Sequence, residues 1–368
     1  MPKPGRQKKI LCSSTDKNER FVLQNCIAYL ETLISPETIL NKEILGVISW
    51  ILGAKFRQVE KRLCGMLSKK ELEQHQYDID NANNTDNSID LIHKILYTSS
   101  KSRITKFITL VRKEFAIRNK CLSYRGKSEI EKNIQNLAKK FNLTQDDIRV
   151  CTFLYITTAW HKAEEYFLTY LKCNAVSGRR YLKTILRMND SQINTVLSGN
   201  LIKIELCAIK NNGFAATDAF AELLLNPSDE DLEAQYFNWV NTKTKRINKH
   251  VIDPQKTEHV LKILSAKRQS ATHILLYGAS DSGKINYAYG IANESGLPAY
   301  EVTSNANNPG GRKAAITACM NSINNRDSII IIDNADELLR KKYFYMKDVE
   351  SEDKSWLIQF LKKPAPKK

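Results

Sequence analysis

The sequence of 368 residues contains little that would suit a membrane or an oxidising compartment. Its longest apolar run begins at Ile44 and has about half of the ~20 residues that a bilayer span needs. No apolar signal core follows the basic first residues, because residues 12–20 are polar or charged. The eight cysteines include no CxxC pair, and no histidine stands at zinc-ligand spacing. We therefore expect a cytoplasmic protein without a membrane helix and with reduced, mostly buried thiols.

A strong positive charge is the first feature that the sequence does have. The net charge is +16, and 42% of the residues are hydrophobic, which is enough for two or three domains with buried cores. A basic surface attracts phosphate backbones without sequence recognition. Lysine and arginine are spread along the whole chain with many Asn and Ile, which a compositional bias would also give. Nucleic acid therefore stays an alternative partner on charge alone.

The chain divides into four expected segments. Residues 1–20 form a basic tail, 21–125 a helical region, and 126–240 a second helical region with a hairpin near 200–218. Residues 241–368 alternate strand, loop and helix. The pair Asn212-Gly213 suits a hairpin turn, and a helix followed by a hairpin is also typical of a winged helix-turn-helix. A structural hairpin packed on a helical bundle is the favoured interpretation.

Local patterns place several helices. Five apolar residues of the first helical region fall on one face at helical spacing: Ile104, Phe107, Ile108, Val111 and Phe115. Residues 78–88 have almost no apolar side chain and predict an exposed loop. Thr144 and Asp147 stand at capping-box spacing, which predicts a helix from about Gln145. Pro254 suits the first turn of another helix.

The C-terminal third predicts a parallel sheet with a phosphate-binding loop. An apolar strand from His273 leads into the pattern Gly278, four residues, Gly283 and Lys284, and a helix follows. Two further strands are expected at Ala299 and at 328–332, the second ending in Asp333. Glycines let backbone amides surround a phosphate, and a lysine adds charge to its oxygens. The candidate nucleotide-binding residues are Gly278, Ala279, Ser280, Asp281, Ser282, Gly283, Lys284 and Ile285.

With these motifs in place, residues from about 250 onward resemble the first half of the core domain of an AAA-type ATPase. The stretch LLYGASDSGK stands at the family's Walker A position, and IIIIDNADELL stands at Walker B. The resemblance implies a partial P-loop NTPase fold of the α/β class, preceded by a mainly α-helical region. It also implies that ATP or ADP binds at the loop, with Mg²⁺ at Asp333.

Two substitutions depart from that family pattern. Ile285 replaces the hydroxyl that would hold Mg²⁺, so Asp333 is the principal remaining protein group for the ion. Asn334 stands at the Walker B glutamate position, where the family has the carboxylate that activates water. An amide can hold a water but cannot take its proton. Asp336 and Glu337 are also acidic, but we interpret them as surface or packing charges in preference to substitutes for the missing glutamate.

The resemblance also implies missing parts. The family's sensor strand, arginine finger and helical lid find no counterpart after residue 364, so we expect a truncated ATPase domain, whether by frameshift, split gene or chosen boundary. The absent strand would lie between those of the glycine loop and Walker B. A polypeptide that carries the second half, or further copies of the chain, are candidate partners. The sequence names no protein substrate.

Three functions remain open at this point. The first is an ATP-binding AAA-type protein with weak or absent hydrolysis. The second is an active ATPase that uses substitute or partner-supplied residues. The third is a non-enzymatic, basic nucleic-acid-binding protein. Nucleotide binding separates the first from the third, and turnover separates the first from the second.

Overall fold

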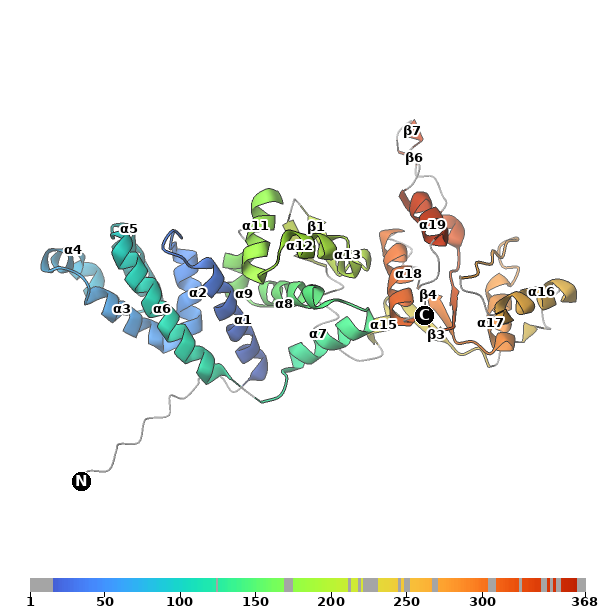
Figure 1. Ribbon diagram of the computed structural model, residues 1–368, viewed down its shortest axis with the longest axis horizontal. Helices are drawn as coiled ribbons and strands as arrows, with labels where there is room; N and C mark the ends of the chain where they lie inside the picture. Colours follow the sequence, from blue (N-terminus) through green and yellow to red (C-terminus); the bar gives the residue numbers. More distant parts are fainter. Residues whose placement is uncertain are drawn as a thin grey trace, which may run out of the picture. The chain divides into compact units, whose positions relative to one another are not determined.

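A computed structural model describes the protein in two compact units (Figure 1). The described residues are 16–123, 125–168, 175–210, 213–217, 220, 231–243, 246–247, 252–266, 271–303, 309–323, 326–338, 343–344, 347–348 and 352–362. Unit 1 comprises residues 1–136, 144–197 and 207–224, and unit 2 comprises 137–143, 198–206 and 225–368. No helix in the described part of the chain has the length and apolar character needed to cross a membrane.

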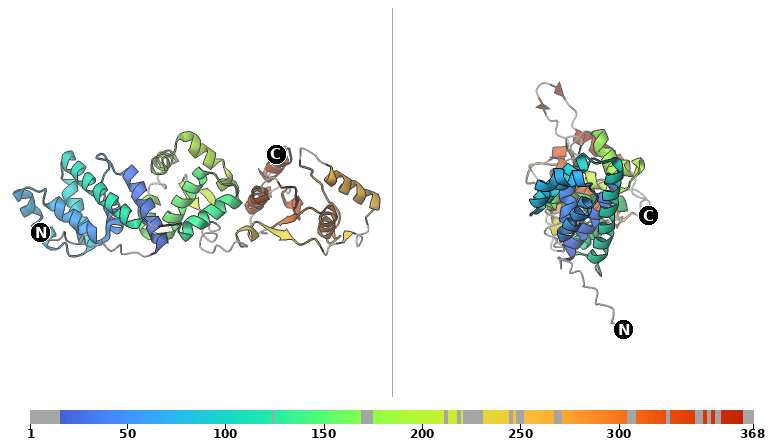
Figure 2. Two further views of the ribbon diagram at one scale, coloured as in Figure 1. Left: turned by 60° about the horizontal axis from the view of Figure 1, so that its bottom comes forward. Right: turned by 90° about the vertical axis from the view of Figure 1, so that its left-hand side faces the viewer.

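Unit 1 consists almost wholly of helices, as the further views in Figure 2 also show. Its helices are α1 (Lys17–Leu33), α2 (Lys42–Leu52), η1 (Gly53–Lys55), α3 (Phe56–Cys64), α4 (Lys69–Asp80), α5 (Thr85–Tyr97), α6 (Lys101–Leu122), α7 (Glu129–Lys140), α8 (Gln145–Ala159), α9 (His161–Ala163), the π-helix η2 (Glu164–Leu168), α11 (Ala175–Leu186) and α12 (Asp190–Leu197). The last residues of α7 belong to unit 2.

The predicted apolar face of α6 is confirmed. Phe107, Ile108, Val111 and Phe115 are at most 3% exposed, and α6 packs against α1, α2 and α3. The predicted start of α8 is also confirmed, because Thr144 and Asp147 form a complete capping box. Satisfying the first amides of a helix in this way stabilises its end by about 1 kcal/mol.

The loop predicted for residues 78–88 is wrong over most of its length. Helix α4 continues to Asp80 and α5 begins at Thr85, so only four residues connect them. Each helix has a capping residue, Ser68 for α4 and Asn84 for α5. A polar sequence can remain helical when its ends are capped and one face is packed, and polarity by itself did not indicate this.

A short hairpin lies at the C-terminal end of unit 1. Strands β1 (Cys207–Lys210) and β2 (Gly213–Ala216) pair antiparallel, with Cys207 opposite Ala216. Of the expected turn pair, Asn212 lies outside the described residues, and Gly213 is the first residue of β2. Strand β2 packs against α8 and α11.

Unit 2 contains a three-stranded sheet with helices beside it. Its elements are α13 (Asn200–Lys203), α15 (Asp231–Ala234), β3 (Phe237–Val240), α16 (Pro254–Ser265), α17 (Lys284–Ser295), β4 (Ala299–Val302), α18 (Pro309–Ile323), β5 (Ile329–Ile331), η4 (Ala335–Leu338), β6 (Tyr343–Phe344), β7 (Lys347–Asp348) and α19 (Glu352–Lys362). The sheet order is β3-β4-β5. The expected helix at Pro254 and the strands at Ala299 and before Asp333 are confirmed.

The sheet is mixed, which corrects the expectation of a purely parallel one. Strands β4 and β5 are parallel, with Glu301 opposite Ile331, but β3 pairs antiparallel with the other edge of β4. Strand β3 was not expected from the sequence. Phe237 packs edge-on against Tyr300, and the Thr303 amide donates to the Tyr236 carbonyl at 2.9 Å. These contacts cover an edge of β4 that would otherwise expose its backbone groups.

Candidate nucleotide-binding site

The loop before α17 has the backbone that a phosphate cradle needs. Gly283 adopts φ 79°, a left-handed conformation that glycine reaches without strain, and Asp281 adopts φ 57°. Helix α17 begins directly afterwards at Lys284. Successive amides in such a turn, followed by a helix N-terminus, form a concave site of positive potential that suits an anion.

Lys284 lies folded into this loop. Its ammonium group donates to the carbonyl oxygens of Gly278 and Ala279, at 3.2 and 2.6 Å, and to Ser282 Oγ at 3.3 Å. The lysine ammonium is therefore held against the backbone of the loop. A phosphate that enters the loop would meet both the loop amides and this cation.

Ile285 has no atom that could bind a metal ion, and its side chain is part of the core. It packs against the core cluster of Ala292, Ala299 and Ile331, which joins α17 to β4 and β5. An apolar side chain in this position adds to the packing between helix and sheet. The place of the hydroxyl ligand expected in the family is thus taken by a core contact.

The same face of the sheet carries a carboxylate that the sequence analysis missed. Residues two apart on a strand share a face, so Glu301 lies on the α17 side together with Ala299. The Tyr289 hydroxyl of α17 donates to Glu301 Oε2 at 2.7 Å. Burial raises the pKa of Tyr289, and the contact with Glu301 and the charge of Asp333 raise this pKa further. The phenol therefore stays neutral and keeps donating.

Asp333 and Asn334 form a tight turn after β5. Asn334 has φ 49°, and its backbone N–H donates to Asp333 Oδ1 at 2.9 Å. This bond uses part of the accepting capacity of the Asp333 carboxylate. The side chain of Asn334 is exposed, and an amide cannot accept a proton from water at neutral pH.

Arg312 holds this turn in place. Its side chain is only 4% exposed and comes from the first turn of α18. Nη1 donates to the Asn334 carbonyl oxygen at 2.8 Å, and Nη2 donates to the Asp333 carbonyl oxygen at 2.7 Å. No sequence signal indicated this role, because Arg312 and Lys313 stand together in α18 like many other basic residues of the chain.

The strand predicted before the loop is wrong. Residues 271–278 have no regular secondary structure. Leu275 and Tyr277 are 76% and 89% exposed, so this apolar stretch is not buried. A strand is stable only when neighbours pair with its backbone, and in the described sheet β4 pairs with β3 and β5, while no described strand pairs with residues 271–278. The segment does contact α19 at its start, where His273 lies 6.4 Å from the Phe360 ring.

Residues 274–367 match the model of the ATPase family associated with various cellular activities (AAA). This segment is an AAA-type ATPase domain. The resemblance found in the glycine loop and in the strand before Asp333 is therefore confirmed at the level of the family. No curated protein and no solved structure matches the chain significantly.

The AAA domain contains the loop residues, Asp333 and Asn334 within one matched segment. Nucleotide binding of the AAA type is the activity that this match supports.

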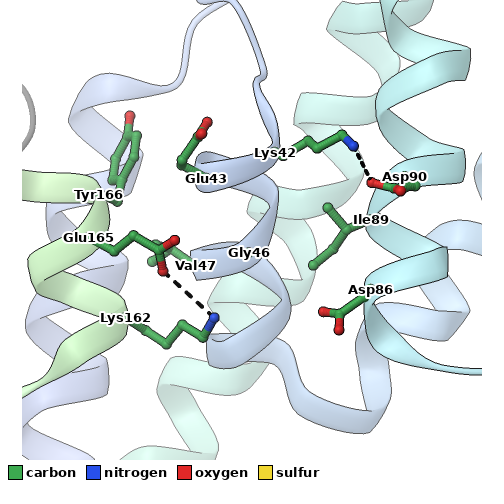
Figure 3. Close-up of a pocket in the computed structure, with 10 residues that line it drawn as sticks. All are labelled: Lys42, Glu43, Gly46, Val47, Asp86, Ile89, Asp90, Lys162, Glu165 and Tyr166. Atoms are coloured by element: carbon green, nitrogen blue, oxygen red, sulfur yellow. Dashed lines mark ion pairs between the residues drawn. The ribbon is translucent and has the colours of Figure 1, made fainter.

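A cavity in unit 1 is separate from the AAA domain in sequence. It has a volume of about 200 Å³ and is lined by residues of α2, α5, α9 and the π-helix η2 (Figure 3). Lys42 pairs with Asp90 at 2.7 Å, and Lys162 pairs with Glu165 at 3.7 Å.

Nowhere in the described ranges do three or more metal-ligating side chains gather as a metal site would require.

Proposed function

We propose that the AAA domain binds ATP and ADP and hydrolyses ATP slowly or not at all. The observation that supports this proposal is the loop of residues 278–283, which leads into α17 and to whose carbonyl oxygens the Lys284 ammonium donates. Backbone amides and one lysine are sufficient for phosphate contact. The amides and the lysine do not provide a general base that could deprotonate the attacking water.

Each residue of the proposed nucleotide site has a role in this proposal. The amides from Gly278 to Gly283 surround the β-phosphate, and Lys284 contacts the β and γ oxygens. Mg²⁺, when bound, would neutralise phosphate charge. Asp333 would hold it through water, while Ile285 and its core contacts supply no ligand. Asn334 would hold a water without deprotonating it.

Further polypeptides are also part of the proposal. Another copy of the chain, or a further polypeptide, is the proposed source of an arginine finger, which can act in trans. The protein substrate stays unassigned.

The test is a titration of folded protein with ATP and ADP. Lys284→Ala should weaken binding at least tenfold, because a hydrogen bond to a charged group contributes about 1.5–3 kcal/mol. Lys262→Ala is a matched control, since Lys262 is an exposed lysine of the same unit that pairs with Glu258. Circular dichroism checks that both variants fold. Equal affinity in wild type and Lys284→Ala would show that the loop is not the site.

A further inference from the structure

Helix α6 in unit 1 has an outer face of one charge sign. Its exposed residues include Lys106, Lys113 and Lys120, which are spaced by seven. Seven residues are almost two helical turns, so the three lysines form a nearly straight row. The residues that face the bundle, from Phe107 to Leu122, lie on the other side of the helix.

The single acidic residue of α6 and that of the neighbouring α3 are both buried. Glu114 is the only acid in α6, is 5% exposed, and accepts from Arg62 Nη1 at 2.8 Å. Helix α3, which packs beside α6, shows the same division. Its only acid, Glu60, is 8% exposed, while Arg57 and Lys61 are exposed. A compositional excess of lysine explains the basic residues but does not explain why both acids are buried.

The row has dimensions that suit a charged polymer. At 1.5 Å per residue, Lys106 and Lys120 are about 21 Å apart along the helix, with a cation about every 10.5 Å. Small residues, Ser102, Thr109 and Ala116, lie beside the row and are exposed. They let a ligand approach the helix closely. Lys101 is excluded from the row because it pairs with Glu37.

We propose that this lysine row (Lys106, Lys113 and Lys120) binds the phosphate backbone of double-stranded nucleic acid without sequence preference. Lysines are flexible point charges, which neutralise phosphates but read no bases. A membrane surface fits less well, because an interfacial helix needs an exposed apolar face. The apolar face of α6 is buried in the bundle, and its one large exposed apolar residue is Ile117. This inference is independent of the nucleotide site.

The experiment uses the full chain and a fluorescein-labelled DNA duplex of mixed sequence, about 20 base pairs long, followed by fluorescence anisotropy. The K106Q/K113Q/K120Q variant should bind roughly 100-fold more weakly at 0.1 M salt. Its slope of log affinity against log salt should fall by about 0.9 for each lost phosphate contact. K106R/K113R/K120R should retain binding, because it keeps the charge.

The matched control is K17Q/K132Q/K139Q, which removes three exposed lysines from α1 and α7. It should bind the duplex within about threefold of wild type, as weak general attraction predicts. Circular dichroism and thermal unfolding confirm that each variant is folded. The proposal is overturned if the two glutamine variants lose affinity equally, or if wild type binds no duplex. Binding of phosphatidylserine vesicles that depends on the row, without duplex binding, would also overturn it.

Discussion

Ile285 packs into the core at a position where the proposed nucleotide site would otherwise have a hydroxyl ligand. It stands at the first turn of α17, where the AAA pattern places a hydroxyl, and it packs against Ala292, Ala299 and Ile331. Its partly buried side chain joins helix and sheet. In the proposed site, Mg²⁺ would therefore have one fewer protein ligand.

Ile285→Thr should make nucleotide binding depend on Mg²⁺ and should lower the melting temperature. The hydroxyl supplies a ligand, while the lost methylene and the polar atom destabilise the contact by about 1–2 kcal/mol. Ile285→Val is the control, since valine has the shape of threonine but no hydroxyl. We expect EDTA to weaken ATP binding to the threonine variant alone. A tenfold effect of EDTA on the wild type would mean that another group completes the shell.

At the scale of elements, a side chain from one helix can fix the end of a distant strand. Arg312 joins the first turn of α18 to the turn after β5 by two charge-assisted hydrogen bonds. Arg312→Met would leave two carbonyl groups without this donor, so we expect a loss of about 2–3 kcal/mol in unfolding free energy. Arg326→Met, at an exposed arginine of the same unit, should change it little. Urea unfolding of both variants measures the difference; equal stabilities would assign Arg312 no such role.

Helices α4 and α6 are joined by an ion pair that should respond to acid. Arg103 of α6 donates to both carboxylate oxygens of Glu71, at 2.7 and 3.0 Å, and Ser68 also donates to this carboxylate. The hydrogen bond from Arg103, aided by Ser68, lowers the pKa of Glu71 to about 2. The folded pKa is below the unfolded value of about 4.3, so the contribution is complete above pH ~4.3 and is lost as pH falls toward 2.

Glu71→Gln should therefore lower the melting temperature at pH 6 more than at pH 3. The difference from wild type should shrink steadily as pH falls between these values. Glu73→Gln, at an exposed glutamate of the same helix, should show no such trend. Thermal unfolding across this pH range is the measurement. A constant difference would mean that the charge of Glu71 is not what joins the two helices.

At the scale of the whole molecule, catalysis requires more than the two substituted positions. The segment before the loop pairs with no described strand, and Leu275 and Tyr277 are exposed. The loop and the turn at Asp333 are therefore not joined through adjacent strands in the described sheet. Groups that must act together on one phosphate need fixed relative positions.

The Ile285→Thr/Asn334→Glu variant should consequently release phosphate slowly when it is alone. An arginine finger can by itself supply ~10³ or more in rate, and no residue of the site is proposed to fill that role. Addition of a polypeptide with the second half of an AAA domain should raise the rate and the melting temperature. Phosphate release with and without that polypeptide is the measurement. Brisk hydrolysis by the unmodified chain, abolished in Lys284→Ala, would contradict the proposed weak activity.

The sequence by itself determined the features that depend on a few neighbouring residues. The cap of α8 at Thr144, the helix at Pro254 and the start of α17 after the glycine loop all follow from short-range patterns. A cap or a left-handed turn is decided within one helical turn of backbone, so its signal is local.

Only the tertiary structure decided which segments join the sheet and which polar groups meet. Strand β3 pairs Phe237 with Val302, and Arg312 reaches Asn334, across sequence separations that no local pattern covers. The apolar stretch before Gly278 has strong strand character, yet it stays exposed because no described strand pairs with it. Strand pairing depends on the partner's backbone as much as on a segment's own residues, and that partner is chosen by the whole fold.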